Sequence, residues 1–153
     1  MKHIKAPGNI PNRGTRVFLA GSIEMGAAEN WQEKLARLVE GTELILLNPR
    51  RDDWDSSWEQ KIEDPKFNEQ VSWELQGIEE SDYMVVVFDP ATKSPITLLE
   101  LGFAAGYKDA GKVFVVCPEG FYRKGNVDIV CERFGLTQFD SIELLATHLI
   151  ENV

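Results

Sequence analysis

The stretch that decides the fold is Ser94-Pro95-Ile96-Thr97-Leu98-Leu99-Glu100-Leu101-Gly102-Phe103-Ala104-Ala105-Gly106-Tyr107, an apolar run that carries one carboxylate. Ser94 can accept hydrogen bonds from the first free backbone N–H groups of a helix. Pro95 suits the first helical position because its missing N–H costs nothing there. The stretch therefore predicts a helix with an apolar face packed against a sheet.

Glu100 is the exception in this helix. At helical spacing it shares a face with Ile96, Phe103, Ala104 and Tyr107. An ionised carboxylate is costly to bury without a partner, so its presence needs a reason. Either it lies at the lip of the core and is satisfied by a loop N–H or an arginine, or it is a nucleophile or general base in a dry cleft.

A second predicted helix, residues 66–80, also carries a carboxylate on a mostly apolar face. Glu74 shares that face with Phe67, Gln70, Val71 and Ile78. Enzymes that cleave a glycosidic bond usually use two carboxyl groups that differ in burial. One attacks the anomeric carbon and the other protonates the leaving group. The alternative is that both are unrelated rim glutamates paired with Arg50 or Arg51.

Apolar strands alternate with amphipathic helices along the chain. We expect strands at 15–20, 43–47, 83–88, 112–116 and 136–139, and helices at 30–39, 66–80, 94–107 and 141–150, with a short helix within 127–134. This order predicts an α/β fold, a doubly wound, flavodoxin-like or Rossmann-like three-layer sandwich with a mostly parallel five-stranded sheet. Residues 1–14 lack periodicity and are predicted to be an N-terminal tail or a cover strand, before one domain at 15–153.

Composition narrows the class of protein. The chain has 153 residues, 16 basic and 25 acidic side chains and a net charge of −9, which argues against a nucleic-acid or membrane surface but not against one small phosphorylated ligand. Cys117 and Cys131 are the only cysteines, which suggests a reducing compartment. The sequence shows neither a signal-peptide pattern nor a run of membrane-spanning length, so we expect a soluble, cytoplasmic protein.

Ligands of such sheets bind at the carboxyl ends of the strands. Four loops should line one cleft there: Gly21–Gly26, Asn48–Pro65, Asp89–Pro95 and Pro118–Asn126. Backbone N–H groups of Gly21-Ser22-Ile23 can cradle a phosphate or a sugar hydroxyl. The dinucleotide glycine pattern is incomplete and the two histidines show no ligand spacing, so we expect neither a nicotinamide cofactor nor a metal.

The long loop after the second strand contains two tryptophans, Trp54 and Trp58. Loops of this length are uncommon unless they bind something or cover a site. The tryptophans either stack on a base or anchor their own loop.

Several short motifs occur in a fixed order over about residues 15–135: Val17-Phe18-Leu19-Ala20-Gly21-Ser22-Ile23, Trp31-Gln32, Leu47-Asn48-Pro49-Arg50-Arg51, Gln70-Val71-Ser72-Trp73-Glu74, Ser94-Pro95-Ile96-Thr97 and Leu99-Glu100-Leu101-Gly102. As a set they resemble the nucleoside 2-deoxyribosyltransferase superfamily, and most closely its nucleoside 2-deoxyribosyltransferase-like branch. The resemblance implies a flavodoxin-like sandwich, in agreement with the sheet argued above.

The resemblance also implies roles for individual residues. Glu100 falls on the nucleophile of the Glu-Leu/Ile-Gly motif, and Glu74 falls on the acid/base carboxylate, which is usually aspartate in the transferases. Ser94 matches a serine that helps to hold the 5′-phosphate in related deoxynucleotide N-hydrolases, although Glu24 stands where those enzymes favour arginine. Asn126 matches an asparagine that closes the sugar site of a neighbouring subunit, which implies a homo-oligomer. The expected substrate-binding residues are Gly21, Ser22, Asn48, Arg50, Gln70, Ser94 and Asn126.

The expected activity is cleavage of the N-glycosidic bond of a (deoxy)nucleoside through a covalent glycosyl-glutamate intermediate, followed by transfer to another base. A retaining double displacement predicts that the two carboxyl groups lie about 5 Å apart. The alternatives are hydrolysis of a nucleoside or a nucleoside 5′-monophosphate at the same site, a non-catalytic nucleotide-binding module, and a structural or interaction domain.

Overall fold

The fold is built on one parallel sheet, described here from a computed structural model that covers residues 1–23 and 29–153. Within these residues the strands are β1 (Lys2–Lys5), β2 (Arg16–Gly21), β3 (Ile45–Asn48), β4 (Tyr83–Val87), β5 (Val113–Val116) and β6 (Thr137–Phe139). They lie in the order β1-β3-β2-β4-β5-β6, and every neighbouring pair is parallel. The prediction of an α/β parallel sheet is thus confirmed.

The predicted number of five strands is wrong, because β1 adds a sixth at the edge of the sheet. Its register pairs Lys2 with Ile45 and Lys5 with Asn48. The side chains of this strand are exposed or half-buried, so no apolar run in the sequence marks it. Backbone hydrogen bonds to β3 hold it, and these leave no signal in the sequence.

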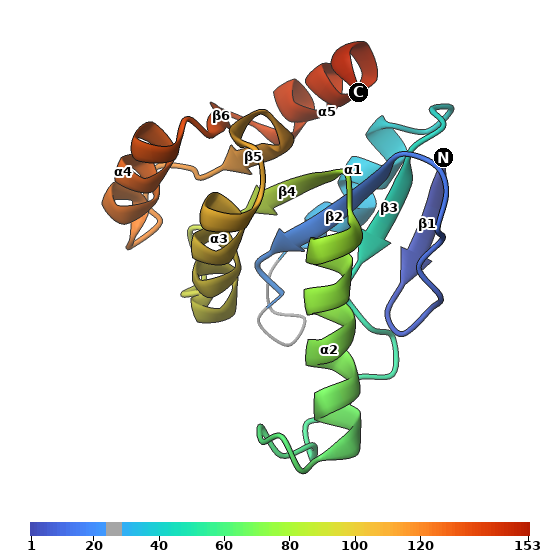
Figure 1. Cartoon of the computed structure of the whole chain (residues 1–153). Coiled ribbons are helices and arrows are strands. Elements are labelled where there is room, and N and C mark those ends of the chain that lie inside the picture. The colour runs from blue at the N-terminus through green and yellow to red at the C-terminus, as the bar shows by residue number, and fades with distance from the viewer. Residues whose placement is uncertain (24–28) are drawn as a thin grey trace.

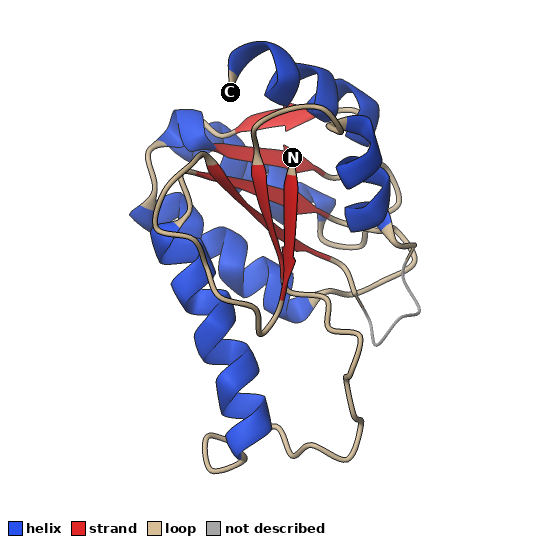
Figure 2. Ribbon diagram, turned by 90° about the vertical axis from the view of Figure 1, so that its right-hand side faces the viewer, coloured by secondary structure: helices blue, strands red, loops and turns tan. Residues whose placement is uncertain are grey.

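Helices cover both faces of the sheet, as Figures 1 and 2 show. The helices are α1 (Trp31–Leu38), α2 (Pro65–Glu80), α3 (Pro95–Tyr107), α4 (Lys124–Phe134) and α5 (Ile142–Asn152), with a 3-10 turn at Ala110–Lys112. Buried side chains of α2, α3 and α4 share one core cluster with the sheet, and those of α1 and α5 share the other. The three-layer prediction is confirmed, and the ambiguous stretch 127–134 belongs to a helix that begins at Lys124.

Helix α2 is fixed at its start and pressed closely against the sheet near its end. The Asp64 carboxylate accepts hydrogen bonds from the backbone N–H groups of Lys66 and Phe67, and Pro65 occupies the first turn. At Gly77 an added Cβ would lie 2.7 Å from the ring of Phe18 on β2, so only glycine lets the helix come this close. In Figure 1 the N-terminal half of α2 projects past the ends of β1 and β3.

The buried face of α3 differs from the one predicted. Its buried residues are Thr97, Glu100, Leu101 and Ala104, whereas Ile96 and Tyr107 are 59% and 57% exposed. The helix is apolar on almost every side, so periodicity could not show which side meets the sheet. Glu100 nevertheless lies on the buried side.

The chain reverses direction in the sheet between β2 and β4. It leaves β2 for β3 on one side and then returns to β4 on the other. Such a switch point opens a crevice at the carboxyl ends of the two central strands. Helix α2 precedes β4 and α3 follows it, so both helices lie beside this point on the same face of the sheet. In the described part of the chain, no helix combines the length and the apolar character needed to span a membrane.

Candidate active site

Glu100 lies in the second turn of α3 and is only 9% exposed. Burial, together with the smaller effect of the nearby negative charge of Glu74, raises the pKa of its carboxyl group to about 8. In the unliganded site this carboxyl group therefore holds a proton at neutral pH.

Glu74 is the second carboxyl group of the site and comes from α2. Burial raises its pKa above the ordinary value, and a hydrogen bond from Gln70 opposes that rise. The Gln70 Nε2 atom lies 2.7 Å from the Glu74 Oε1 atom. The charge on Glu74 acts on Glu100, so ionisation of one carboxyl group opposes ionisation of the other.

Arg51 does not form an ion pair with Glu74 or Glu100. Arg51 is buried and contacts Asp53 at 2.8 Å and Glu69 at 3.0 Å, and its hydrogen bond lowers the pKa of Glu69. No ion pair of Glu74 or Glu100 occurs within residues 1–23 and 29–153. The alternative of two rim glutamates paired with Arg50 or Arg51 is therefore wrong for these positions.

Three buried hydroxyl groups meet at the switch point. Ser22 follows β2, Thr92 and Ser94 precede α3, and their oxygens lie 2.5–2.9 Å from one another. The Ser22 hydroxyl also accepts from the backbone N–H of Asp89 at 2.9 Å. Thr92 is not among the residues predicted from the sequence, where its only signal is its place in the loop between β4 and α3.

The structure overturns one expectation for these residues and narrows another. Ser94 has a φ of 46° and makes no side-chain cap to α3, because its hydroxyl group is turned to Ser22 and Thr92. The backbone N–H of Ser22 donates to Val87 at 3.0 Å, so it is not free to cradle a ligand. Gly21 has a packing role, since an added Cβ would lie 2.5 Å from Trp31 and from the Val87 carbonyl oxygen.

The residues after β3 lie at the same edge of the sheet. The Asn48 side chain is fully engaged, with Oδ1 accepting from the Arg50 backbone N–H and Nδ2 next to His3 Nε2, both at 2.9 Å. The Arg50 side chain is half-buried, and its Nη1 has no hydrogen-bond partner within the described chain. Gln70 donates from Nε2 to the Pro49 carbonyl oxygen at 2.8 Å as well as to Glu74.

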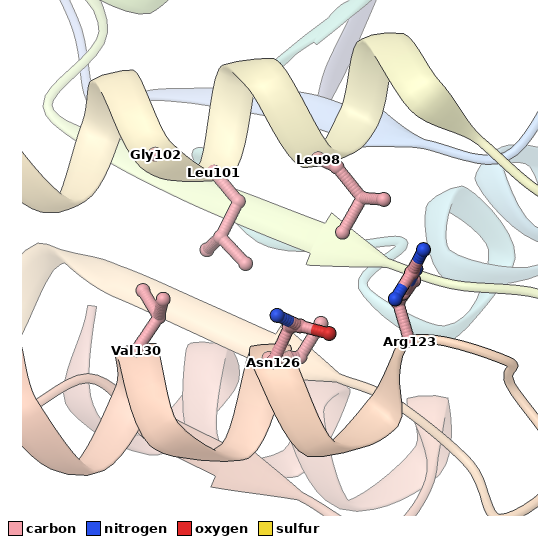
Figure 3. Close-up of a pocket in the computed structure, with 7 residues that line it drawn as sticks. Leu98, Leu101, Gly102, Arg123, Asn126 and Val130 are labelled. Atoms are coloured by element: carbon pink, nitrogen blue, oxygen red, sulfur yellow. The ribbon is translucent and has the colours of Figure 1, made fainter.

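Asn126 lies apart from the two carboxyl groups. It is exposed on α4 and lines a pocket of about 280 Å³ between α3 and α4, together with Arg123 and Leu98 (Figure 3). The lining of this pocket includes neither Glu74 nor Glu100. Asn126 is therefore placed on an outer surface of its own chain.

The tryptophan loop is anchored to its own chain. The rings of Trp54 and Trp58 pack edge to face at 4.9 Å, and the Arg51 guanidinium lies 5.0 Å from the Trp58 ring. These contacts favour anchoring of the loop over stacking on a base. Glu24 and Gly26, which belong to the first predicted ligand loop, lie outside the described residues.

Comparison with known proteins identifies the family of the chain. The family model described as nucleoside 2-deoxyribosyltransferase like matches residues 14–121, well over half of the chain. This chain belongs to that family. Among solved structures, the crystal structure of a conserved protein from Enterococcus faecalis V583 has a TM-score of 0.65 and 15% identity, and the match covers 92% of this chain and 100% of that one. No curated protein sequence matches the chain.

Within this nucleoside 2-deoxyribosyltransferase-like chain, the family match and the site overlap closely. The matched residues 14–121 include both carboxyl groups, the hydroxyl cluster and the residues after β3. They end before α4 and so exclude Asn126. The similarity to the Enterococcus protein concerns the fold alone.

Proposed function

We propose that this protein cleaves the N-glycosidic bond of a (deoxy)nucleoside and transfers the sugar to another base. The observation that carries the proposal is the pair of electrostatically coupled carboxyl groups at the switch point of the sheet, the buried Glu100 and the half-buried Glu74. The family match supports the general class of activity. The strand order β3-β2-β4-β5-β6 agrees with the 2-1-3-4-5 order of the flavodoxin-like fold that the resemblance implies.

In the proposed first step the carboxylate of Glu100 attacks C1′ of the sugar. The C1′–N bond breaks, a C1′–O bond to Glu100 forms, and the proton of Glu74 passes to the departing nitrogen of the base. In the second step the acceptor base attacks C1′, its proton returns to Glu74, and the Glu100 carboxylate is released. The residues of the chain supply all the groups that this reaction needs.

The reaction needs one proton on the pair, but on Glu74 rather than on Glu100. Glu100 already holds a proton near neutral pH, because its pKa is about 8 in the unliganded site. We infer that this proton moves from Glu100 to Glu74 when the substrate is bound. The leaving base then takes the proton that the nucleophile has given up, and none is drawn from solvent.

The test is incubation with a panel of deoxynucleosides and their 5′-monophosphates, followed by chromatography for free base and for exchanged nucleoside. A transferase turns over only when an acceptor base is present, whereas a hydrolase releases base without one. A rise in melting temperature with no base release would instead support a nucleotide-binding module. No release and no rise with any substrate would contradict both proposals.

Hydrolysis of a nucleoside 5′-monophosphate is the second candidate. The hydroxyl groups of Ser22, Thr92 and Ser94 adjoin the N-terminus of α3, which has no side-chain cap, and both features suit a phosphate. Faster base release from a monophosphate than from its nucleoside, reversed in Ser22→Ala, would favour this candidate. Equal rates for the two substrates would contradict it.

A homo-oligomer is part of the proposal. The outer faces of α3 and α4 expose Ile96, Leu99 and Ile129 at 59%, 69% and 68%, next to the pocket that contains Asn126. Large exposed apolar side chains on two neighbouring helices fit a self-complementary interface. Light scattering should show an oligomer that Leu99→Glu dissociates, and a monomeric native protein would contradict this part.

Both cysteines of the chain, Cys117 and Cys131, are free and buried. We therefore expect the protein to act in the cytoplasm.

A further inference from the structure

The side chain of Gln70 has a fixed orientation. Its Nε2 atom lies 2.8 Å from the Pro49 carbonyl oxygen and 2.7 Å from Glu74 Oε1. Both neighbours only accept hydrogen bonds when Glu74 is ionised, so a flipped amide would set its oxygen against two acceptors. The Oε1 atom of Gln70 is buried and has no hydrogen-bond partner within the described chain. The amide therefore spends both of its N–H groups on protein acceptors, and neither is left for a substrate.

The anchor of Gln70 is itself held in place. Pro49 is buried between Asn48 and Arg50 in the sequence. The Asn48 side chain accepts through Oδ1 from the Arg50 backbone N–H, and its Nδ2 lies next to His3 Nε2, both at 2.9 Å. A run of hydrogen bonds thus leads from the edge strand β1, through the turn after β3, to the carboxyl group on α2. A fixed support of this kind is what an acid needs to stay aligned with a leaving group.

We infer that Gln70 is a positioning residue, which holds Glu74 through Oε1 and leaves its other oxygen, Oε2, to carry the proton to the leaving base. This inference rests on the proposed function for its catalytic consequence, but not for its structural part. The substrate contact that the sequence predicted for Gln70 stays a prediction beside this positioning role.

A matched control exists on the same helix. Gln76 donates to Glu80 Oε1 at 2.8 Å with the same four-residue spacing, but this pair is exposed. Replacing Gln76 removes an equivalent hydrogen bond without touching the site. The variants to compare are Gln70→Met, which keeps the length and loses both donors, and Gln76→Met. Gln70→Glu is the second choice if Gln70→Met does not fold, because it keeps the size but cannot donate two hydrogen bonds.

The first readout is the pKa of Glu74, measured in each variant by carbon NMR of its carboxyl group. Removing a donor from the ionised form must raise this pKa, so we expect a rise in Gln70→Met and none in Gln76→Met. An unchanged Glu74 pKa in Gln70→Met would overturn the inference. This readout needs no enzymatic activity.

The second readout is base release as a function of pH. We expect Gln70→Met to lower kcat by roughly 10- to 100-fold with little change in KM, and to move the acid limb of the profile to higher pH. A purely structural role would lower the melting temperature and leave that limb in place, which would contradict the inference. If the native protein releases no base, the proposed function fails, and the titration alone decides the role of Gln70.

Discussion

Helix α2 carries the same glutamine–glutamate pair twice, and the two copies have different surroundings. Gln70 and Glu74 lie 2.7 Å apart in a buried site, whereas Gln76 and Glu80 lie 2.8 Å apart in an exposed one. Glu80 also lies 4.0 Å from Arg16, while Glu74 has no cationic partner among the described residues. The local bonding is alike, so the difference in chemistry must come from burial and from neighbouring charge.

Glu100 makes the difference larger. Its carboxyl group approaches Glu74 from α3, and the charge of one opposes ionisation of the other. Two carboxyl groups whose charges interact in this way suit acid and nucleophile roles at neutral pH. The exposed pair on α2 has no such neighbour to work with.

The largest expected effect follows from removing the proposed nucleophile. Glu100→Ala should abolish base release, by at least about 10³-fold, because no covalent intermediate can form. Chromatography of free base, with circular dichroism to verify the fold, measures this. Glu80→Gln is the exposed control and should leave the rate unchanged. A native rate of base release in Glu100→Ala would show that the reaction does not require the pair of Glu74 and Glu100.

Removing the acid should cost less and should depend on the substrate. Glu74→Gln keeps the shape but has no proton to give, so base release should fall by roughly 10²- to 10⁴-fold. The loss should be greatest for bases that leave poorly, as measured across a series of substrates. An equal loss for every leaving group would remove the acid role from Glu74.

The pH dependence of base release should report the shared proton. Above a pH of about 8 the pair loses its last proton, so kcat/KM should fall as pH rises through the pKa of Glu100. It should fall again in acid, where both carboxyl groups are protonated and Glu100 cannot attack. A rate that stays constant well above pH 8 would mean that the pair supplies no proton.

Stability should depend on pH in the opposite sense to that of a salt-bridged carboxylate. The native pKa of Glu100 lies above its unfolded value, so its destabilising effect is absent below about pH 4.5 and grows up to about pH 8. Glu100→Gln should therefore stabilise the protein, by a few kcal/mol at pH 8 and little at pH 4. Melting temperatures across this range measure it, with Glu80→Gln as the control. A constant difference would contradict the burial of an ionisable group.

The smallest expected effects concern how closely α2 lies against the sheet. Gly77→Ala places a methyl group against Phe18 and should destabilise the protein by about 1–3 kcal/mol. Gly102→Ala on α3 meets no atom within 4 Å and should be neutral or stabilise by up to about 1 kcal/mol. Chemical denaturation of both variants tests the pair. Equal effects would mean that Gly77 does not set the depth of the helix.

Much of the fold could be predicted from the sequence because strong local signals agreed. Apolar runs marked β2, β3, β4 and β5, the four strands with buried side chains, and helical periodicity placed the start of α2 within a residue. The edge strand β1 could not be predicted, since its residues Lys2–Lys5 bury little and its pairing is made by the backbone. The buried side of α3 could not be predicted either, because apolar residues surround the helix.

The site was predictable only in part. Glu74 and Glu100 stood out because each interrupts an apolar face, and the structure brings them to the same side of the sheet. The engagement of Ser94, Asn48 and Gln70 by other protein groups could not be predicted, because it depends on partners 2 to 72 residues away in the chain. Their roles toward a substrate remain predictions.

The central claim is that Glu100 forms a covalent bond with the sugar. The most direct measurement is mass spectrometry of the protein quenched during reaction with a deoxynucleoside, followed by peptide mapping. The account predicts a 2-deoxyribosyl adduct on the peptide that contains Glu100, absent from Glu100→Gln. Base release without any such adduct, continuing in Glu100→Gln, would contradict it.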